Sequence, residues 1–229
     1  MPRPTLRTIS WIKAARKDFE AFPTKAIDRA LDALTVVADG GVPDIAKPLS
    51  GLGAGVWELA IKERGDAYRV VYALQLGDDI WVVHAFQKKS TKGIATPRHE
   101  IDLVRERIKR LKDVGMTDQA DDLELVRGSG NAFADFAAPD ASLRQLRAIL
   151  AAEIVKTLDK ERLTVRDAEA RTGIAAADFS RIRQVKLDRF TIDRLMRILD
   201  RLNRDVRVKI SVAPRARISR RTAPSPLAA

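Results

Sequence analysis

Clustered lysines follow directly on an apolar segment near the middle of the chain. The run IWVVHAF ends at Phe86, and Lys88, Lys89 and Lys92 come within the next six residues. Ammonium groups at this density can bind the phosphate oxygens of a polyanion. The alternative interpretation is a solvated loop whose lysines only contact water. What the lysines do therefore depends on the elements that hold them.

Composition limits the classes of protein that the chain can be. The 229 residues include no cysteine and only two histidines, which argues against disulfides, thiolate metal sites and a metalloenzyme. No apolar run approaches the roughly 18 residues that a membrane span requires, and the first ten residues lack the apolar core of a signal peptide. We expect a cytoplasmic protein that needs no cofactor and has no membrane partner. Its net charge of +11 favours nucleic acid as a partner.

Charge is unevenly distributed and suggests two domains. Residues 116–140 hold six acidic residues and one basic residue, Arg127, between two basic halves. We predict a first domain over 1–113, an acidic linker over 114–138 and a second domain over 139–212. Residues 213–229 combine proline, arginine and small residues without periodicity, which is typical of a disordered basic tail.

Hydrophobic periodicity in the first half predicts an α+β fold. A short helix is expected from Ser10 to Pro23, and a second over 25–41 with Ile27, Leu31 and Leu34 on its apolar side. The segments VWELAIK, AYRVVYALQL and IWVVHAF then alternate as strands of a three- or four-stranded antiparallel sheet. Thr96 and Pro97 are expected to begin a final helix, with Thr96 as its N-cap.

The first half resembles the RelE/ParE toxin superfamily, and within it the HigB-like, phage-derived branch. The resemblance covers residues 5–112 and is carried by GVWELAIKERGDAYRVVYAL, IWVVHAFQKKSTKGIATPRHEI and the basic helix that follows. It implies a metal-independent mRNA endonuclease that works on the ribosome, in which a ribose 2′-OH attacks the adjacent phosphate.

Such a reaction requires a base, an acid and cations that stabilise the phosphorane. On the resemblance, Arg69 and Lys89 stabilise the transition state, Lys88 and Lys92 bind backbone phosphates, and Arg64 adds a further cation. His99 is a possible base or acid, because a position in the first turn of a helix favours neutral imidazole. His84, inside an apolar strand, is better explained as a hydrogen-bonded structural residue.

The second half resembles the Xre-class helix-turn-helix domains of HigA-like antitoxins over residues 139–212. An amphipathic helix with leucines at 143, 146, 150 and 158 precedes a short helix capped by Thr164, a turn at Gly173, a second short helix over 176–184 and a third capped by Thr191. The segment VRVKISV is expected to form a final short strand.

This second resemblance implies that one helix reads operator DNA in the major groove. The residues that it places toward bases are Ala177, Asp178, Arg181 and Arg183, and those that it places toward phosphates are Ser180, Arg166 and Lys186. The structural alternative is a helical bundle with solvated basic faces.

Together the two resemblances predict a toxin fused to its antitoxin, with an intramolecular contact between them. We expect helix 142–159 and the acidic segment 116–138 to cover the basic cleft of the toxin, because opposite charges would meet there. The expected partners are mRNA on the ribosome and operator DNA, and the antitoxin class implies a homodimer. Two other functions stay open: a DNA-binding regulator with an inactive toxin-like scaffold, and a ParE-like gyrase inhibitor.

Overall fold

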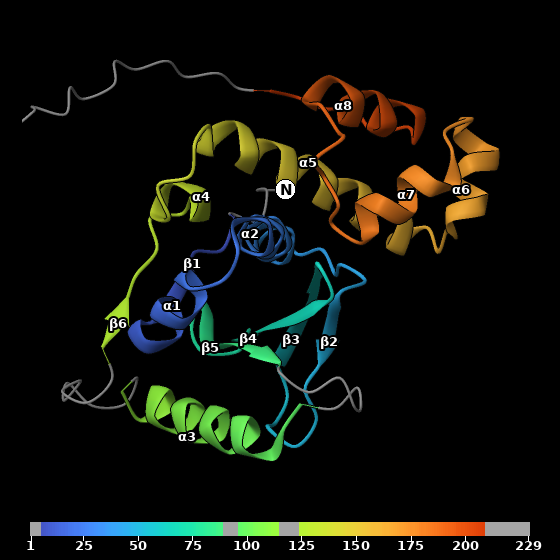
Figure 1. Ribbon diagram of the computed structural model, residues 1–229. Helices are drawn as coiled ribbons and strands as arrows, with labels where there is room; N and C mark the ends of the chain where they lie inside the picture. Colours follow the sequence, from blue (N-terminus) through green and yellow to red (C-terminus); the bar gives the residue numbers. More distant parts are fainter. Residues whose placement is uncertain (1–5, 89–95, 115–123, 209–229) are drawn as a thin grey trace, which may run out of the picture.

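The computed structural model describes residues 6–88, 96–114 and 124–208 (Figure 1). A mixed sheet with helices on both faces forms the N-terminal half, and the C-terminal half is helical. The expected α+β class is confirmed. In the described ranges, no helix has both the length and the apolar character needed to cross a membrane.

Over the described residues the sheet has six strands, two or three more than predicted. They are β1 (Ile9–Ile12), β2 (Ala46–Pro48), β3 (Val56–Glu63), β4 (Asp66–Ala73), β5 (Ile80–Lys88) and β6 (Leu125–Val126), in the order β2-β3-β4-β5-β1-β6. The predicted meander β3-β4-β5 forms its antiparallel centre, and β2 extends it at one edge. On the other side β1 pairs parallel with β5, and β6 pairs antiparallel with β1.

The start of the predicted first helix is a strand instead. Residues Ile9–Ile12 are all buried in β1, and α1 (Lys13–Glu20) begins only afterwards. Ser10 and Trp11 lie opposite Trp81 and Val82 of β5, about 70 residues along the chain. A pairing partner so distant overrides the local helical pattern, because strand formation depends on neighbours that a sequence window does not contain.

Two helices cover opposite faces of the sheet. Figure 1 shows α2 (Thr24–Ala38) above the sheet and α3 (Arg98–Val114) below it. The predicted apolar side of α3 is confirmed, since Val104, Ile108 and Leu111 are buried. The helix begins at Arg98. The Thr96 hydroxyl, which was expected to cap it, donates to Glu58 on β3 (2.5 Å).

Helix α2 lies between the sheet and the C-terminal half. Every residue from Ala30 to Ala38 is buried, as expected for a helix that is covered on both sides. The covering element is α5 (Ala141–Lys160), which packs along α2. A single apolar cluster connects the sheet, α2, α5 and the helices that follow, so the two halves share one core.

Most of the amphipathic stripe predicted for α5 is confirmed. Leu150, Ile154 and Leu158 are buried, whereas Leu143 is 58% exposed and Leu146 lies at the surface. The remaining helices are α4 (Ala132–Asp135), α6 (Val165–Thr172), α7 (Ala176–Arg183) and α8 (Ile192–Arg201).

The described part of the predicted acidic linker is folded onto the N-terminal half. Residues Leu125–Val126 form β6, and the loop after it passes so close to β1 that a Cβ on Gly128 would lie 2.2 Å from the carbonyl oxygen of Ile9. Phe136 packs edge-on against Trp11 and Phe19.

The final strand is not formed over residues 203–208. The rest of the segment predicted for it, and the tail 213–229, lie outside the described residues.

Candidate functional site

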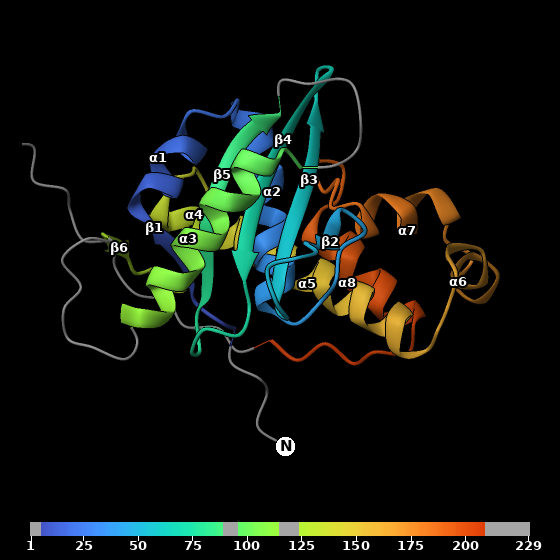
Figure 2. The same cartoon turned by 90° about the horizontal axis from the view of Figure 1, so that it is seen from below.

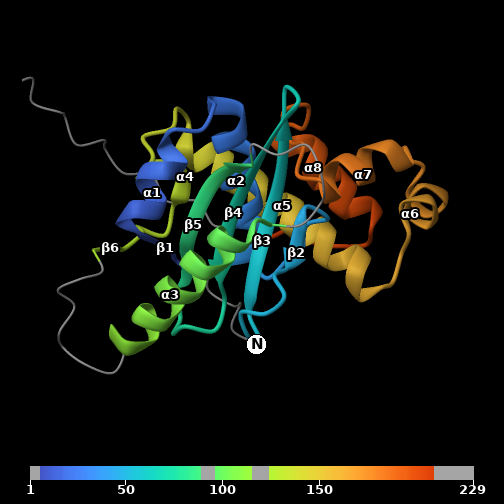
Figure 3. The same cartoon turned by 60° about the horizontal axis from the view of Figure 1, so that its bottom comes forward.

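A polar cluster lies between the sheet and α3. Cross-strand pairing puts Lys88 beside Ala67, Phe86 beside Arg69 and His84 beside Val71, so these side chains share the face that α3 covers (Figure 3). Glu58 lies on the same face of β3, two residues from the Ala60 that pairs with Arg69. Arg69 and Lys88, both predicted site residues, are therefore brought together at one end of the sheet.

Arg69 is enclosed rather than open to solvent. Its side chain is 9% exposed, and its Nε lies 3.0 Å from Oε1 of Glu58, which is equally buried. The Nε–H does not point at that oxygen in hydrogen-bonding geometry, while Nη1 donates to the carbonyl oxygen of Tyr68 (3.2 Å). Glu58 also accepts the hydrogen bond from Thr96. The guanidinium is thus neutralised internally in this conformation.

His84 occupies a fixed position beneath α3. Its Nε2 lies 2.6 Å from Glu100 Oε2, and its Nδ1 lies 2.9 Å from Nη1 of Arg107. An arginine can only donate, so Nδ1 must accept, and the ring proton belongs on Nε2, which donates to Glu100. Burial lowers the pKa of His84, and the hydrogen bond to Glu100 only partly offsets this effect. The expected structural role of His84 agrees with this neutral, doubly bonded imidazole.

The other predicted catalytic residues are less enclosed or lie outside the described chain. Arg64 is exposed in the β3–β4 turn, at the same end of the sheet as Lys88. His99 is 77% exposed, and its Nε2 lies 3.2 Å from Glu100 Oε1. Lys88 itself is 9% exposed. Lys89 and Lys92 lie outside the described residues.

Three members of the cluster were missed from the sequence: Glu58, Glu100 and Arg107. Glu58 carried a usable signal, because it stands between two apolar residues of a strand that packs on both faces. Glu100 and Arg107 lie about two helical turns apart on α3, and they contact His84 only because α3 docks on the sheet. In the described chain, no group of histidines and acids is placed to hold a metal ion.

The helix-turn-helix is present and its caps are as predicted. Thr164 accepts from the backbone N–H of Asp167, whose carboxylate in turn accepts from Thr164, and Gly173 ends α6 in the left-handed region at φ 72°. Thr191 caps α8. Phe179 and Ile182 are fully buried, as expected for the inner side of α7.

The predicted DNA-contacting residues fall into two groups. Ala177, Arg166 and Lys186 are exposed, and Ser180 is half-buried with its hydroxyl accepting from Gln184 (3.1 Å). Asp178 is held by Arg181 at 3.0 Å and by Arg194 at 2.5 Å. Because both oxygens of Asp178 are paired, its carboxylate has little capacity left to accept a hydrogen bond from a cytosine. Arg194 of α8 thereby lies beside the predicted DNA-contacting residues of α7.

Arg183 connects the two halves instead of projecting from them. Its Nε donates to Asp44, in the loop after α2 (2.9 Å), and its Nη1 donates to Asp159 near the end of α5 (2.6 Å). The backbone N–H of Asp44 also donates to the carbonyl oxygen of Arg183 (2.8 Å). This arginine therefore positions α7 on the N-terminal half.

Helix α5 does not cover the polar cluster, contrary to the expectation for residues 142–159. Figure 1 shows α3 on one side of the strands and α5 on the other, with α2 between the strands and α5, and Figure 2, seen from below, shows α3 in front of the strands. Opposite charges do meet between the halves, but the acids are on α2 and the bases are on α5. Asp28 pairs with Arg144 (2.7 Å), Asp32 with Arg147 (3.9 Å) and Asp39 with Lys156 (2.7 Å).

Comparison with known proteins agrees with this division. Residues 17–109 match the family described as phage derived protein Gp49-like, a RelE/HigB-like toxin family, and residues 132–211 match a helix-turn-helix domain. A search of curated proteins and a search of solved structures returned no match. The chain is thus similar to a toxin-type family over much of its N-terminal half and to a helix-turn-helix domain over its C-terminal half.

Proposed function

We propose that the chain is a toxin–antitoxin protein in one cytoplasmic polypeptide. Its C-terminal half binds operator DNA and represses its own transcription, and its N-terminal half is a latent ribosome-dependent mRNA endonuclease. The observation that carries the proposal is the exposed helix-turn-helix on a chain whose toxin-type half encloses Arg69 beneath α3.

The DNA-binding half is supported by the geometry of α6 and α7. Arg166 at the start of α6, Ala177 on α7 and Lys186 after α7 are all exposed, as phosphate-binding cations and a small residue that approaches base edges must be. The antitoxin class implies a homodimer that would match a palindromic operator. Sedimentation of the purified chain tests this, since a monomer at micromolar concentration would contradict the dimer.

Binding to DNA can be measured by fluorescence anisotropy against a selected operator and a random duplex. Arg166→Ala and Lys186→Ala should weaken binding to both duplexes and each reduce the salt dependence by about one phosphate contact. Arg183→Gln is the matched control, because this arginine is bound to Asp44 and Asp159. A salt dependence equal in all four proteins would contradict this docking of α6 and α7.

The nuclease half is supported by the arrangement of Arg69 and Lys88 on one face of the sheet, with His99 and Glu100 at the start of α3. In the proposed reaction the ribose 2′-OH gives its proton to a base and attacks the adjacent phosphate, and the cations stabilise the phosphorane. The bond from phosphorus to the 5′ oxygen then breaks, which leaves a cyclic phosphate and a 5′-OH that has taken up a proton from an acid. Latency then comes from the N-terminal half itself, because Glu58 and Thr96 enclose Arg69 while α5 lies on the other side.

Cleavage can be measured as new mRNA 5′ ends in a translation system that contains ribosomes. The full chain should be nearly silent, and Thr96→Ala together with Glu58→Gln should release cleavage by freeing Arg69. Adding Arg69→Gln to that variant should abolish the new ends again. A folded Thr96→Ala/Glu58→Gln protein without any ribosome-dependent cleavage would exclude the nuclease.

A second candidate function is a DNA-binding regulator with an inactive toxin-like scaffold. The inactive scaffold is favoured by two sets of internal contacts: Arg69 pairs with Glu58, and His84 bonds to Glu100 and Arg107. The same experiment separates the two functions: a scaffold yields operator binding in the anisotropy assay and no mRNA cleavage in any variant.

A further inference from the structure

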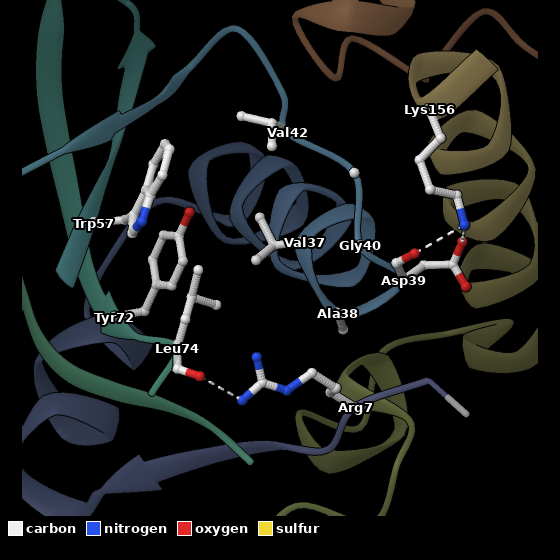
Figure 4. Close-up of a pocket in the computed structure, with 11 residues that line it drawn as sticks. Arg7, Val37, Ala38, Asp39, Gly40, Val42, Trp57, Tyr72, Leu74 and Lys156 are labelled. Carbon is white, nitrogen blue, oxygen red and sulfur yellow. Dashed lines mark hydrogen bonds and ion pairs between the residues drawn. The ribbon is translucent and has the colours of Figure 1, made fainter. Parts of the chain in front are cut away.

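A cavity of about 450 Å³ lies where the two halves meet, on the side of the sheet away from the polar cluster (Figure 4). The end of α2 forms one wall with Val37, and β3 and β4 form another with Trp57, Tyr72 and Leu74. Arg7, just before β1, and Lys156 on α5 complete the lining. This volume is in the range of cavities that hold small organic ligands.

Tyr72 places an unused hydrogen-bonding group in this cavity. Its side chain is 1% exposed, and its hydroxyl points into the space between Trp57 and Val37 (Figure 4). Within the described chain, that hydroxyl has no hydrogen-bond partner. Burial raises the pKa of Tyr72, so the hydroxyl keeps its proton and remains a donor. The hydroxyl is open to the cavity and is not one of the buried atoms that lack a partner, so a ligand that accepts its hydrogen bond takes the place of water there.

Arg7 supplies a second donor in a fixed position. Its Nε donates to the carbonyl oxygen of Asp78, and its Nη2 donates to those of Leu74 and Asp79, all at 2.8 Å. These bonds hold the guanidinium against the β4–β5 turn and leave Nη1 without a partner in the described residues. Figure 4 shows Nη1 directed toward the cavity. The group is pre-organised, so binding an anion would cost little additional ordering.

The charge of the lining favours an anion. The ammonium of Lys156 lies 2.7 Å from Asp39 and 2.8 Å from Glu153, which neutralises it locally. The guanidinium of Arg7 contacts backbone carbonyls only, so its positive charge is not balanced by a carboxylate. The remaining walls are apolar or aromatic, with Trp57 partly open to the cavity.

We propose that this cavity binds a small aromatic carboxylate that carries a second polar group. The carboxylate accepts from Nη1 of Arg7, and the second group accepts from the Tyr72 hydroxyl. The ring packs against Trp57 and the aliphatic side chains of Val37 and Leu74. Lys156 of α5 closes the cavity on the other side, where its ammonium stays paired with Asp39 and Glu153. The inference is independent of whether the N-terminal half cleaves RNA.

Isothermal titration calorimetry of the full chain tests the proposal with three probes. 4-Hydroxybenzoate has both polar groups, benzoate lacks the hydroxyl, and 4-hydroxybenzamide lacks the charge. We expect 4-hydroxybenzoate to bind about tenfold more tightly than either of the others, the ratio that one satisfied hydrogen bond of this kind supplies. Equal binding of all three probes, or no saturable binding of any of them, would overturn the proposal.

Tyr72→Phe shows whether binding takes place in this cavity. The variant removes one oxygen without changing the packing of the ring, and it should weaken 4-hydroxybenzoate about tenfold while leaving benzoate unchanged. Lys112→Gln, which lines a different cavity near β6, is the matched control and should leave both affinities unchanged. If Tyr72→Phe, shown to be folded by its thermal unfolding, binds 4-hydroxybenzoate like the native protein, the ligand lies elsewhere and the assignment fails.

Discussion

At the scale of single residues, Asp32 is an acid buried where α2 meets α5. It is 3% exposed, and its Oδ1 lies 3.9 Å from Nη2 of Arg147 without a hydrogen bond. Burial raises the pKa of Asp32 to about 7, although the charges of Arg147 and Arg144 act to lower it. The folded chain therefore binds a proton that the unfolded chain, with a carboxyl pKa near 3.9, has released at neutral pH.

The first prediction concerns the pH dependence that follows from Asp32. Because its pKa is higher in the folded state, its contribution to stability is present at low pH and is lost as the pH rises from about 4 through 7. Asp32→Asn should remove this loss and stabilise the chain at pH 8 by on the order of 2 kcal/mol. Urea unfolding of both proteins at pH 5 and pH 8 measures the difference. A stability gap that is equal at the two pH values would contradict the prediction.

The second prediction concerns the pair of Arg69 and Glu58. Removing one member of a buried ion pair leaves the other charge without compensation, so Arg69→Gln should destabilise the protein by about 3 kcal/mol. Changing Glu58→Gln as well should recover most of that loss. Thermal unfolding of the single and double variants provides the measurement. Purely additive effects would show that the two side chains do not interact.

At the scale of elements, β6 completes the sheet through a close backbone contact. A methyl group at Gly128 would collide with the carbonyl oxygen of Ile9, and the backbone of β1 cannot move without disturbing its pairing with β5. Ser10, which accepts from the N–H of Gly128 (3.2 Å) and donates to Asp79 (2.6 Å), ties the same loop to the β4–β5 turn.

The third prediction follows from this contact. Gly128→Ala should displace the loop and cost about 2–3 kcal/mol of stability, comparable with other overpacked sites. Gly130→Ala is the matched control: its φ of 91° strains an alanine, but no atom lies near the new methyl group. Hydrogen exchange at β1 should increase only in the first variant. Equal exchange in both would indicate that β6 is dispensable.

At the scale of the whole molecule, the two halves are joined along α2 and α5. The three ion pairs advance in the same direction on both helices, from Asp28 and Arg144 to Asp39 and Lys156, so the contact follows each helix toward its C-terminal end. Residues 1–112 alone would lack α5 and β6 and would expose the side of α2 that α5 covers. Activity is therefore better tested in the full chain.

The fourth prediction tests this interface by charge exchange. Arg144→Glu should destabilise the docking of α5 by about 1–2 kcal/mol, since it replaces an attraction to Asp28 by a repulsion and removes the packing of Arg144 on Phe133. Adding Asp28→Arg should restore part of that loss. The rate of limited proteolysis between α4 and α5 measures how firmly α5 is docked. If Asp28→Arg does not slow the proteolysis of the Arg144→Glu variant, the ion pair is not what stabilises the docking.

The sequence by itself determined the elements whose signals are local. Alternation fixed the strands β3, β4 and β5, helical periodicity fixed α2 and α3, and Thr164, Gly173 and Thr191 fixed the ends of the helix-turn-helix. The resemblance also named Arg69 and Lys88 as site residues, and the pairing of β4 with β5 brings them to one end of the sheet.

Only the tertiary structure decided the contacts between distant segments. The pairing of β1 with β5 and β6, the enclosure of Arg69 by Glu58 and Thr96, and the use of Arg183 as a bridge to Asp44 have no signal within a short window. The surface that α5 covers was predicted wrongly for a different reason. An amphipathic pattern shows that one side of a helix must be covered, but not which surface covers it. Helix α5 packs on α2 and not on the polar cluster because its apolar side joins the core there. Three acids, Asp28, Asp32 and Asp39, also pair with bases of α5 on that side of the sheet.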